Sequence, residues 1–227
     1  MFDKNRNQQA LAWAKKITAL RLLGGKCSCG ASDPLVLDFH HDDKDKEVNV
    51  SRLRHSRLTT MKREVFKCTV VCANCHGEIH SSECKNSDPR KRMLKEKLLE
   101  IKGQSRCILC GYDKACSLEF HHARDKKFDI STYIFNRLDI PWESVLEEIN
   151  KCKILCKNCH RIEHLKESFE KLYSLIEKKI FEHKEQQDPA DRNEVLRLYT
   201  MGVPQIQIAR NLGYCKATIS LIIKKFR

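Results

Sequence analysis

The chain has 227 residues, enough for two or three small domains, and carries 43 Lys and Arg against 30 Asp and Glu. The resulting charge of +13 is spread along the sequence and favours a polyanionic partner, although a Lys-rich surface alone would give the same balance. The 13 cysteines are an odd number, which disfavours full pairing in disulfides. The sequence shows no signal-peptide core and no long apolar run, so we expect a cytoplasmic protein and not a secreted or membrane protein.

The first third of the chain alternates predicted secondary structure with thiol- and imidazole-rich turns. Apolar residues at helical spacing predict a helix over residues 5–23, which Gly24 and Gly25 end. Residues 35–41 predict a strand that closes on two histidines, and residues 58–67 predict a second helix. The helix leads into residues 72–80, where two cysteines three apart precede two histidines four apart.

This arrangement occurs a second time. After a predicted linker over 81–88 and a predicted helix over 89–101, the sequence Leu-Glu-Phe-His-His at 118–122 matches Leu-Asp-Phe-His-His at 37–41. The stretch 72–80 returns 84 positions later, between Cys156 and His164. We therefore infer that one unit has been duplicated, and we name residues 1–84 copy one and residues 85–166 copy two.

Each copy contains two closely spaced pairs of cysteines, a pattern typical of a structural zinc site. They are Cys27, Cys29, Cys72 and Cys75 in copy one and Cys107, Cys110, Cys156 and Cys159 in copy two. The first pair of copy one has one residue between its thiols instead of two, which could strain that turn or weaken metal binding. The alternative, buried free cysteines, fits Cys68 and Cys152 better, and we expect these two in the core.

The histidines predict a second kind of metal site. Residues four apart share one face of a helix, so His160 and His164 can bind one ion. A zinc ion that clamps the two thiol turns would bring His121 and His122 close to that helix. A module this small cannot hold such geometry by core burial alone, so the metal would take the place of a larger core.

Other interpretations of the same residues remain open. His76 and His80 could replace cysteines as zinc ligands in a purely structural finger. Each His-His pair could be a strand end that packs against the thiol turn. Asp38 and Glu119, two positions before the first histidine of each pair, could orient an imidazole or be only solvated.

Taken together, these residues resemble the HNH endonuclease family, also called ββα-metal or His-Me finger nucleases. The resemblance covers residues 25–80 and 102–164 and depends on Phe-His-His, on Lys-Cys-x-x-x-Cys-x-Asn-Cys-His and on the final histidine. It implies an α+β fold, with two tandem ββα-metal zinc-knuckle nuclease modules before a small all-α domain.

The resemblance also implies a role for each matching residue. The ligands of a catalytic divalent ion, Mg²⁺ or another, would be His40, His76, His80, His121, His160 and His164. The general bases would be His41 and His122, and the motif asparagines Asn74 and Asn158 would brace the loop that carries the base. Gly77 departs from the pattern, because the family usually has a basic residue there, as at Arg161. Copy one could therefore be an inactive module that only binds DNA.

The C-terminal part predicts helices only. Apolar residues at helical spacing predict one long connecting helix over 165–187. Beyond it, Ala209, Gly213 and Ile219 have the spacing of a helix-turn-helix, although an ordinary three-helix tail is the alternative. The side chains expected to face DNA are those of Lys216, Ala217, Ser220 and Lys224.

The sequence thus predicts four parts: residues 1–84, 85–166, 167–187 and 188–227. We expect a homing or restriction-like DNA endonuclease with two structural zinc ions. Its two HNH sites would act on double-stranded DNA as a pseudo-dimer within one monomeric chain. A zinc-stabilised DNA-binding regulator with decayed nuclease modules is the alternative, and RNA cleavage is a third, less favoured one.

Overall fold

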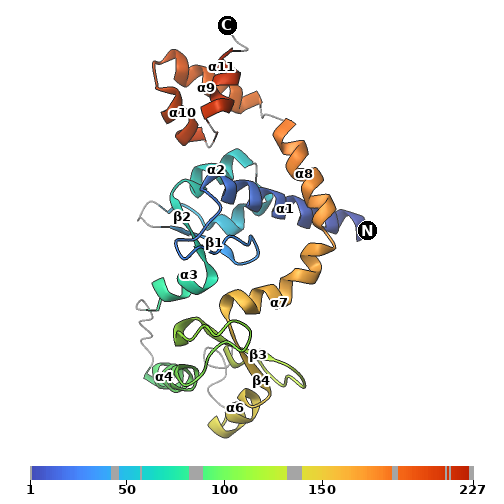
Figure 1. The fold of residues 1–227 in the computed structure, drawn as a ribbon, viewed down its shortest axis with the longest axis vertical. Helices are drawn as coiled ribbons and strands as arrows, with labels where there is room; N and C mark the ends of the chain where they lie inside the picture. The colour runs from blue at the N-terminus through green and yellow to red at the C-terminus, as the bar shows by residue number, and fades with distance from the viewer. Residues whose placement is uncertain are drawn as a thin grey trace. The chain divides into compact units, whose positions relative to one another are not determined.

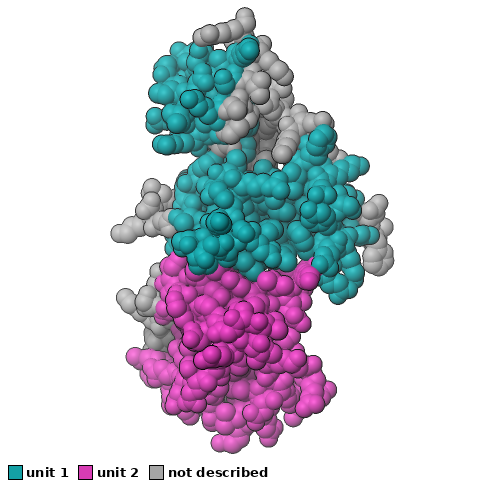
Figure 2. All heavy atoms as spheres, viewed as in Figure 1, with its two compact units in different colours: residues 1–71, 167–227 teal, residues 72–166 magenta. Residues whose placement is uncertain are grey.

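The computed structural model describes residues 2–41, 46–56, 58–81, 89–131, 140–185, 189–212, 214 and 216–224. Helices predominate in them and the strands form two separate two-stranded sheets, which confirms the mixed α+β class (Figure 1). The chain divides into two compact units, one of residues 1–71 and 167–227 and one of residues 72–166 (Figure 2). These two units are defined by contacts within the folded chain and do not test the predicted division into four consecutive parts, which stays a prediction. Among the described helices, none combines the length and apolar character that a bilayer crossing requires.

The first unit begins with helix α1 (Phe2–Leu22), close to the predicted span. Gly24 and Gly25 end it with φ angles of 89° and 62°, a left-handed conformation that glycine adopts without strain. One face of α1 packs on helix α8 (Tyr173–Glu185), and the Trp13 ring meets Phe169 edge to face. The buried residues of this contact are Ala10, Ala14, Ile17, Leu172 and Ile176.

The predicted connecting helix over 165–187 is wrong as a single element. The first residues of this span belong to helix α7 (Lys157–Glu170). Two residues then separate α7 from α8. At the break the Leu172 N–H bonds the carbonyl of Phe169, three residues back, at 3.0 Å, a tighter turn than the α-helix. The break lets Leu172 and Ile176 bury against α1, with 5% and 1% of their surfaces exposed, so core burial decides the path of the chain.

Copy one continues in this unit with strand β1 (Leu37–His41), the 3₁₀ helix η1 (Val50–His55), helix α2 (Leu58–Val65) and strand β2 (Cys68–Cys72). The two strands pair. Helix α2 and η1 close a small core over the sheet, formed by Ala19, Val50, Leu53, Met61, Val65 and Cys68.

The three helices of the C-terminal part are α9 (Pro189–Thr200), α10 (Gln205–Leu212) and α11 (Lys216–Lys224). They enclose the residues whose spacing predicted a helix-turn-helix, including Ala209 and Ile219, which are 6% and 0% exposed. The predicted turn residue Gly213 lies outside the described residues.

The second unit starts with helix α3 (Ala73–Ile79) of copy one and helix α4 (Pro89–Gly103), which was predicted over 89–101. The predicted linker between them lies, apart from Ser81, outside the described residues. Copy two follows with η2 (Ala115–Ser117), strand β3 (Leu118–His122), helix α6 (Trp142–Ile149), strand β4 (Cys152–Cys156) and α7. Its core consists of two clusters, which include Leu94, Leu98, Leu118, Ile130, Val145 and Leu155.

Strands β3 and β4 are antiparallel, with Leu118 opposite Cys156 and His122 opposite Cys152. Successive side chains of a strand point to opposite faces, so the adjacent histidines of β3 lie on opposite faces of the sheet. His121, with Glu119, faces α7, where both contact His160. His122 turns to the other face, beside Glu148 of α6. One strand thus supplies two separate sites.

Candidate metal centres

The four predicted thiols of copy two come together. Cys107, Cys110, Cys156 and Cys159 have sulfur atoms within 4.8 Å of one another. The sulfurs of Cys110 and Cys156 are 3.7 Å apart, close to the edge of about 3.8 Å that four sulfurs have around one zinc ion. The N–H of Cys159 also donates to the Cys156 sulfur at 3.4 Å. The donor set and its geometry therefore fit zinc, and this cluster could hold a zinc ion.

The acidity of these thiols fits the same ligand. Burial opposes ionisation of Cys107, but backbone N–H groups, including that of Cys110, outweigh it and lower the pKa to about 7. Burial and neighbouring thiols raise the pKa of Cys159 far above its ordinary range. Burial also raises the pKa of Cys110, as do the neighbouring thiols of Cys107 and Cys156. A divalent cation bound among the sulfurs would favour the thiolate form, which is the form that binds metals.

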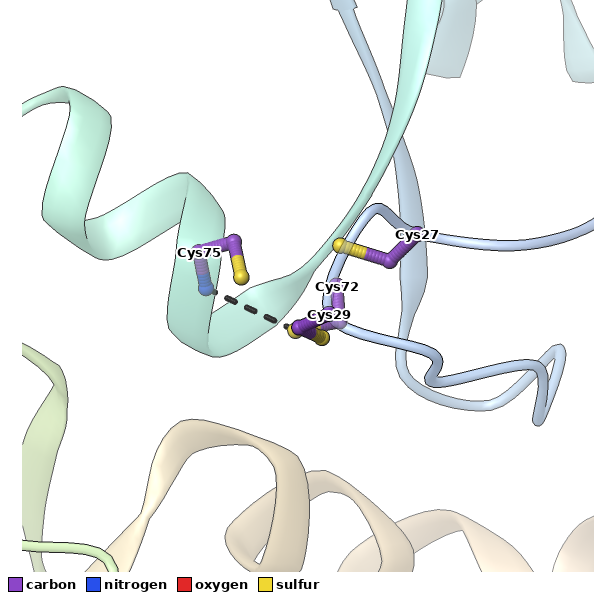
Figure 3. Close-up of side chains that lie close together, drawn as sticks. All are labelled: Cys27, Cys29, Cys72 and Cys75. Carbon is purple, nitrogen blue, oxygen red and sulfur yellow. Dashed lines mark hydrogen bonds between the residues drawn. The ribbon is translucent and has the colours of Figure 1, made fainter.

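The four thiols of copy one meet the same criterion in spite of their shorter first pair. In Figure 3 the side chains of Cys27, Cys29, Cys72 and Cys75 lie around one point, and the dashed line marks the 3.5 Å bond from the Cys75 N–H to the Cys72 sulfur. The missing residue is absorbed by the turn itself. The carbonyl of Cys27 accepts from an N–H three residues on, whereas that of Cys107 accepts from one four residues on, both at 2.9 Å. This cluster could also hold zinc.

The predicted histidine cluster of copy two is present as well. His121 of β3 and His160 and His164 of α7 place one ring nitrogen each within 4.8 Å of one another. The Nε2 atoms of His160 and His164 are 3.1 Å apart, and the His121 ring lies 5.2 Å and 5.0 Å from those two rings. Three imidazoles that converge in this way could hold a metal ion.

Two further observations favour a cation at this point. Nδ1 of His121 is buried and has no hydrogen-bond partner among the described residues, a costly state that a metal ion would relieve. Burial and the neighbouring imidazoles lower the pKa of His121, so the ring is kept in its neutral, metal-binding form.

Glu119 fixes the orientation of one of these rings. Its Oε2 lies 2.5 Å from Nδ1 of His160, which leaves Nε2 of that ring to face the cluster. Carboxylates that hold a ligating histidine in this way are common around protein metal ions. Of the two alternatives left open by the sequence, Glu119 therefore orients an imidazole. The corresponding histidines of copy one, His40, His76 and His80, also bring ring nitrogens within 4.8 Å of one another.

The second histidine of each pair contacts a buried glutamate that sequence reasoning missed. Nε2 of His122 is 3.0 Å from Oε1 of Glu148, close enough for an ion pair but not aligned for a hydrogen bond. In copy one, Nε2 of His41 forms a 2.8 Å hydrogen bond with Glu64. Both glutamates precede a repeated Lys-Cys pair by three residues, and this duplicated Glu-x-x-Lys-Cys pattern is the signal that could have found them.

Each glutamate also ties down the loop that follows β1 or β3. Glu148 is 1% exposed and accepts from the N–H of Lys127 at 2.8 Å and from Lys151 at 2.7 Å. Burial alone would raise its pKa, but these donors lower it to about 2. Glu64 is held in the same way, and its pKa is also lowered to about 2. Both carboxylates are therefore charged. Glu64 orients the His41 imidazole through a hydrogen bond, and Glu148 lies within ion-pair distance of the His122 imidazole. As expected, Cys68 and Cys152 belong to the cores and donate to backbone carbonyls instead.

The motif asparagines join the two copies within the second unit. The N–H of Asn74 donates to Oδ1 of Asn158 at 3.1 Å, and the N–H of Asn158 donates to Oδ1 of Asn74 at 3.0 Å. Ser117 of copy two donates to the Asn74 carbonyl at 2.7 Å, and Tyr112 donates to Glu78 at 2.6 Å. Reciprocal bonds are the mark of a two-fold interface. We name this contact the asparagine joint. The predicted bracing of the base loop stays a prediction.

The joint also accounts for Gly77, which is buried in it. A Cβ atom at this position would overlap Oγ of Ser117 and lie 2.7 Å from Nζ of Lys157. The glycine is therefore required by the close approach of the copies, and its departure from the family pattern is no sign of decay by itself.

A cavity of about 870 Å³ lies in the second unit next to the joint. Imidazoles of both copies line it, namely His76 and His80 from copy one and His121, His122, His160 and His164 from copy two. It could admit an extended ligand to both histidine clusters.

On the predicted DNA-reading helix α11, the side chains of Lys216, Ser220 and Lys224 are exposed. The side chain of Ala217 lies outside the described residues. Comparison of the chain with protein-family models, curated proteins and solved structures found no match.

Proposed function

We propose that the chain is a metal-dependent DNA endonuclease of the HNH type, with two hydrolytic sites in one polypeptide. One observation carries the proposal: beside a four-thiol cluster, His121, His160 and His164 converge on one point while His122 points away to a buried carboxylate. Copy one repeats this combination. A purely structural finger has no use for a second group of imidazoles or for a charged glutamate held against the neighbouring histidine.

In this proposal each residue has a defined task. His121, His160 and His164 would hold the divalent ion, which when bound would offset the charge that develops on the phosphate. His122 would take the proton from the attacking water, and the Glu148 carboxylate beside Nε2 leaves Nδ1 as the accepting nitrogen. Glu148 would also stabilise the imidazolium that results, because it is charged and buried.

The proposed substrate is double-stranded DNA. The net charge of +13 favours a polyanion, and the exposed Lys216 and Lys224 of α11 are suitable for contacts in a groove. The asparagine joint supports action as a pseudo-dimer, since it links the two copies within one chain. With one three-helix domain for two sites, we expect an asymmetric target and cleavage to one side of it.

The test is cleavage of supercoiled plasmid by the zinc-loaded chain with Mg²⁺ or Mn²⁺. We expect nicked and linear products, and no product from the double variant His41→Ala, His122→Ala. If the wild-type protein binds the plasmid but cuts it with neither ion, the DNA-binding regulator is the better interpretation. Preferential cleavage of a competing RNA would instead favour the RNA nuclease.

A further inference from the structure

The two copies differ in their supply of positive charge beside the histidines. Copy two has Lys157 and Arg161 in the first turns of α7, whereas the equivalent positions of copy one, 84 residues earlier, are Ala73 and Gly77. A Lys or Arg side chain near the phosphate would help a metal ion to stabilise the charge that develops during hydrolysis. Copy one, considered alone, lacks both of these cations.

The structure places one of these two cations, Lys157, beside helix α3 of copy one. Nζ of Lys157 would lie 2.7 Å from a Cβ at Gly77, so the ammonium occupies the space that a side chain at that position would fill. Gly77 follows His76 directly in α3, and His76, His80 and Lys157 all line the same cavity. The position is well defined, because Lys157 precedes Asn158 of the asparagine joint and Ser117 is bonded to the Asn74 carbonyl.

The cavity around this ammonium has an excess of positive charge. Its cationic lining residues are Lys95, Lys102, Arg124, Lys126, Lys157 and Arg161, against the acidic Glu119, Asp125 and Asp129. Lys126 and Asp129 pair with each other, and Glu119 is engaged by His160. Burial and the ammoniums of Lys157 and Lys95 lower the pKa of Lys102 to about 8, against the opposite effect of Glu119. Such a cavity favours an anion.

We propose that Lys157 of copy two is the phosphate-binding cation of the copy-one histidine centre, supplied across the asparagine joint in place of the side chain that Gly77 lacks. The inference deepens the proposed function and assigns a phosphate ligand to that centre. Copy one is then complete only in the presence of copy two.

The first experiment needs no cleavage. Inorganic phosphate is titrated into the zinc-loaded full chain with Mg²⁺, and the ring resonances of His76 and His80 are followed by NMR. We expect them to shift in the wild-type protein, and the phosphate affinity to fall about tenfold to a hundredfold in Lys157→Gln, since a charged hydrogen bond is lost. Lys166→Gln, at an exposed lysine of the same helix that does not line the cavity, is the matched control and should keep the affinity. Lys157→Arg should restore the affinity that Lys157→Gln loses, which would rule out misfolding of that variant. Unmoved His76 and His80 resonances, or a Lys157→Gln variant that binds as tightly as the wild type, would overturn the proposal.

A second experiment separates this inference from the proposed function. In the His122→Ala background, Lys157→Gln should slow nicking by the remaining site about tenfold or more, and in the His41→Ala background Arg161→Gln should have the larger effect. A larger effect of Lys157→Gln on the copy-two site would contradict the assignment. A chain that binds phosphate as expected but never cuts DNA would disprove the nuclease and leave the Lys157 assignment intact.

Discussion

Copies one and two share their clusters of thiols and imidazoles and differ in the residues around them. Both have four converging thiols, three converging imidazoles and a second histidine held by a buried glutamate. The differences are the short turn at Cys27, and Ala73 and Gly77 in place of Lys157 and Arg161. Helix α3 has 7 residues where α7 has 14.

A residue that looks degenerate in one copy can be required by its contact with the other. Gly77 appears defective beside Arg161 when the copies are aligned in sequence. In the structure it allows Ser117 and Lys157 to approach α3. Copy one therefore keeps the thiols, the imidazoles and the buried glutamate that copy two has.

The largest effect should come from removing a zinc ligand. Cys156→Ser and Cys72→Ser should each leave one bound zinc ion in place of two and unfold the affected module, because structural zinc contributes on the order of 10 kcal/mol. Metal analysis and circular dichroism measure both outcomes. The core cysteines provide the matched controls, since Cys152→Ser and Cys68→Ser should keep two zinc ions. Equal loss of metal in the control variants would contradict the assigned ligand sets.

The next effect concerns the glutamates that hold the second histidines. Glu148→Gln and Glu64→Gln should each destabilise the protein at pH 7 by on the order of 2 kcal/mol, since charged hydrogen bonds are lost. The folded pKa of each carboxyl is lowered to about 2 from an ordinary 4.5, so its stabilising effect is complete above pH 4.5 and disappears as the pH falls towards 2.

Urea unfolding of each variant and the wild type at pH 7, 5 and 3.5 tests this prediction. The difference between the two proteins should be constant from pH 7 to 5 and smaller at 3.5. A difference that grows on acidification would show that the carboxylates do not have the depressed pKa values on which the orienting role depends.

A smaller effect is expected from filling the joint. Gly77→Ala should destabilise the second unit by about 1 to 3 kcal/mol, because overpacking outweighs the usual gain of replacing a helical glycine by alanine. Arg161→Ala, at the equivalent position of copy two, should change stability by less than about 0.5 kcal/mol. Thermal unfolding measures both. A Gly77→Ala variant more stable than the wild type would mean that Ser117 and Lys157 do not approach α3 as closely as the structure has them.

The smallest effect concerns the reciprocal bonds of the joint. Asn74→Ala and Asn158→Ala should each cost about 1 kcal/mol. Because the two bonds close one contact, the double variant should cost less than the sum of the singles by at least about 0.5 kcal/mol. Strict additivity in the same unfolding assay would show two independent hydrogen bonds and no closed joint.

Much of this arrangement was predictable from local sequence. The thiol spacing indicated both four-cysteine clusters, and the repeated His-His strand end placed His121 with His160 and His164. Helical periodicity gave α1, and a proline in the first helical position gave α4. Apolar spacing gave the buried positions of the three C-terminal helices, such as Ala209 and Ile219. These features depend on residues close together in the chain or on a repeated pattern.

The missed features depend on residues that meet only in the folded chain. Strands β2 and β4 and helix α6 were not predicted, although the duplication places α6 84 residues after α2. The break between α7 and α8 follows from burial of Leu172 against α1, a contact between distant segments. The asparagine joint could not be predicted for the same reason, since a sequence motif does not specify which backbone N–H group its asparagine side chain will bind.

A plasmid time course with the two single variants tests directly whether both histidine sites are hydrolytic. If both copies are hydrolytic sites of one pseudo-dimer, His41→Ala and His122→Ala should each stop at nicked circles, whereas the wild-type protein goes on to linear DNA. Each lost base should slow its own site by about 10² to 10⁴. Linear product from His122→Ala at the wild-type rate, or no change in either variant, would contradict the assignment of these histidines.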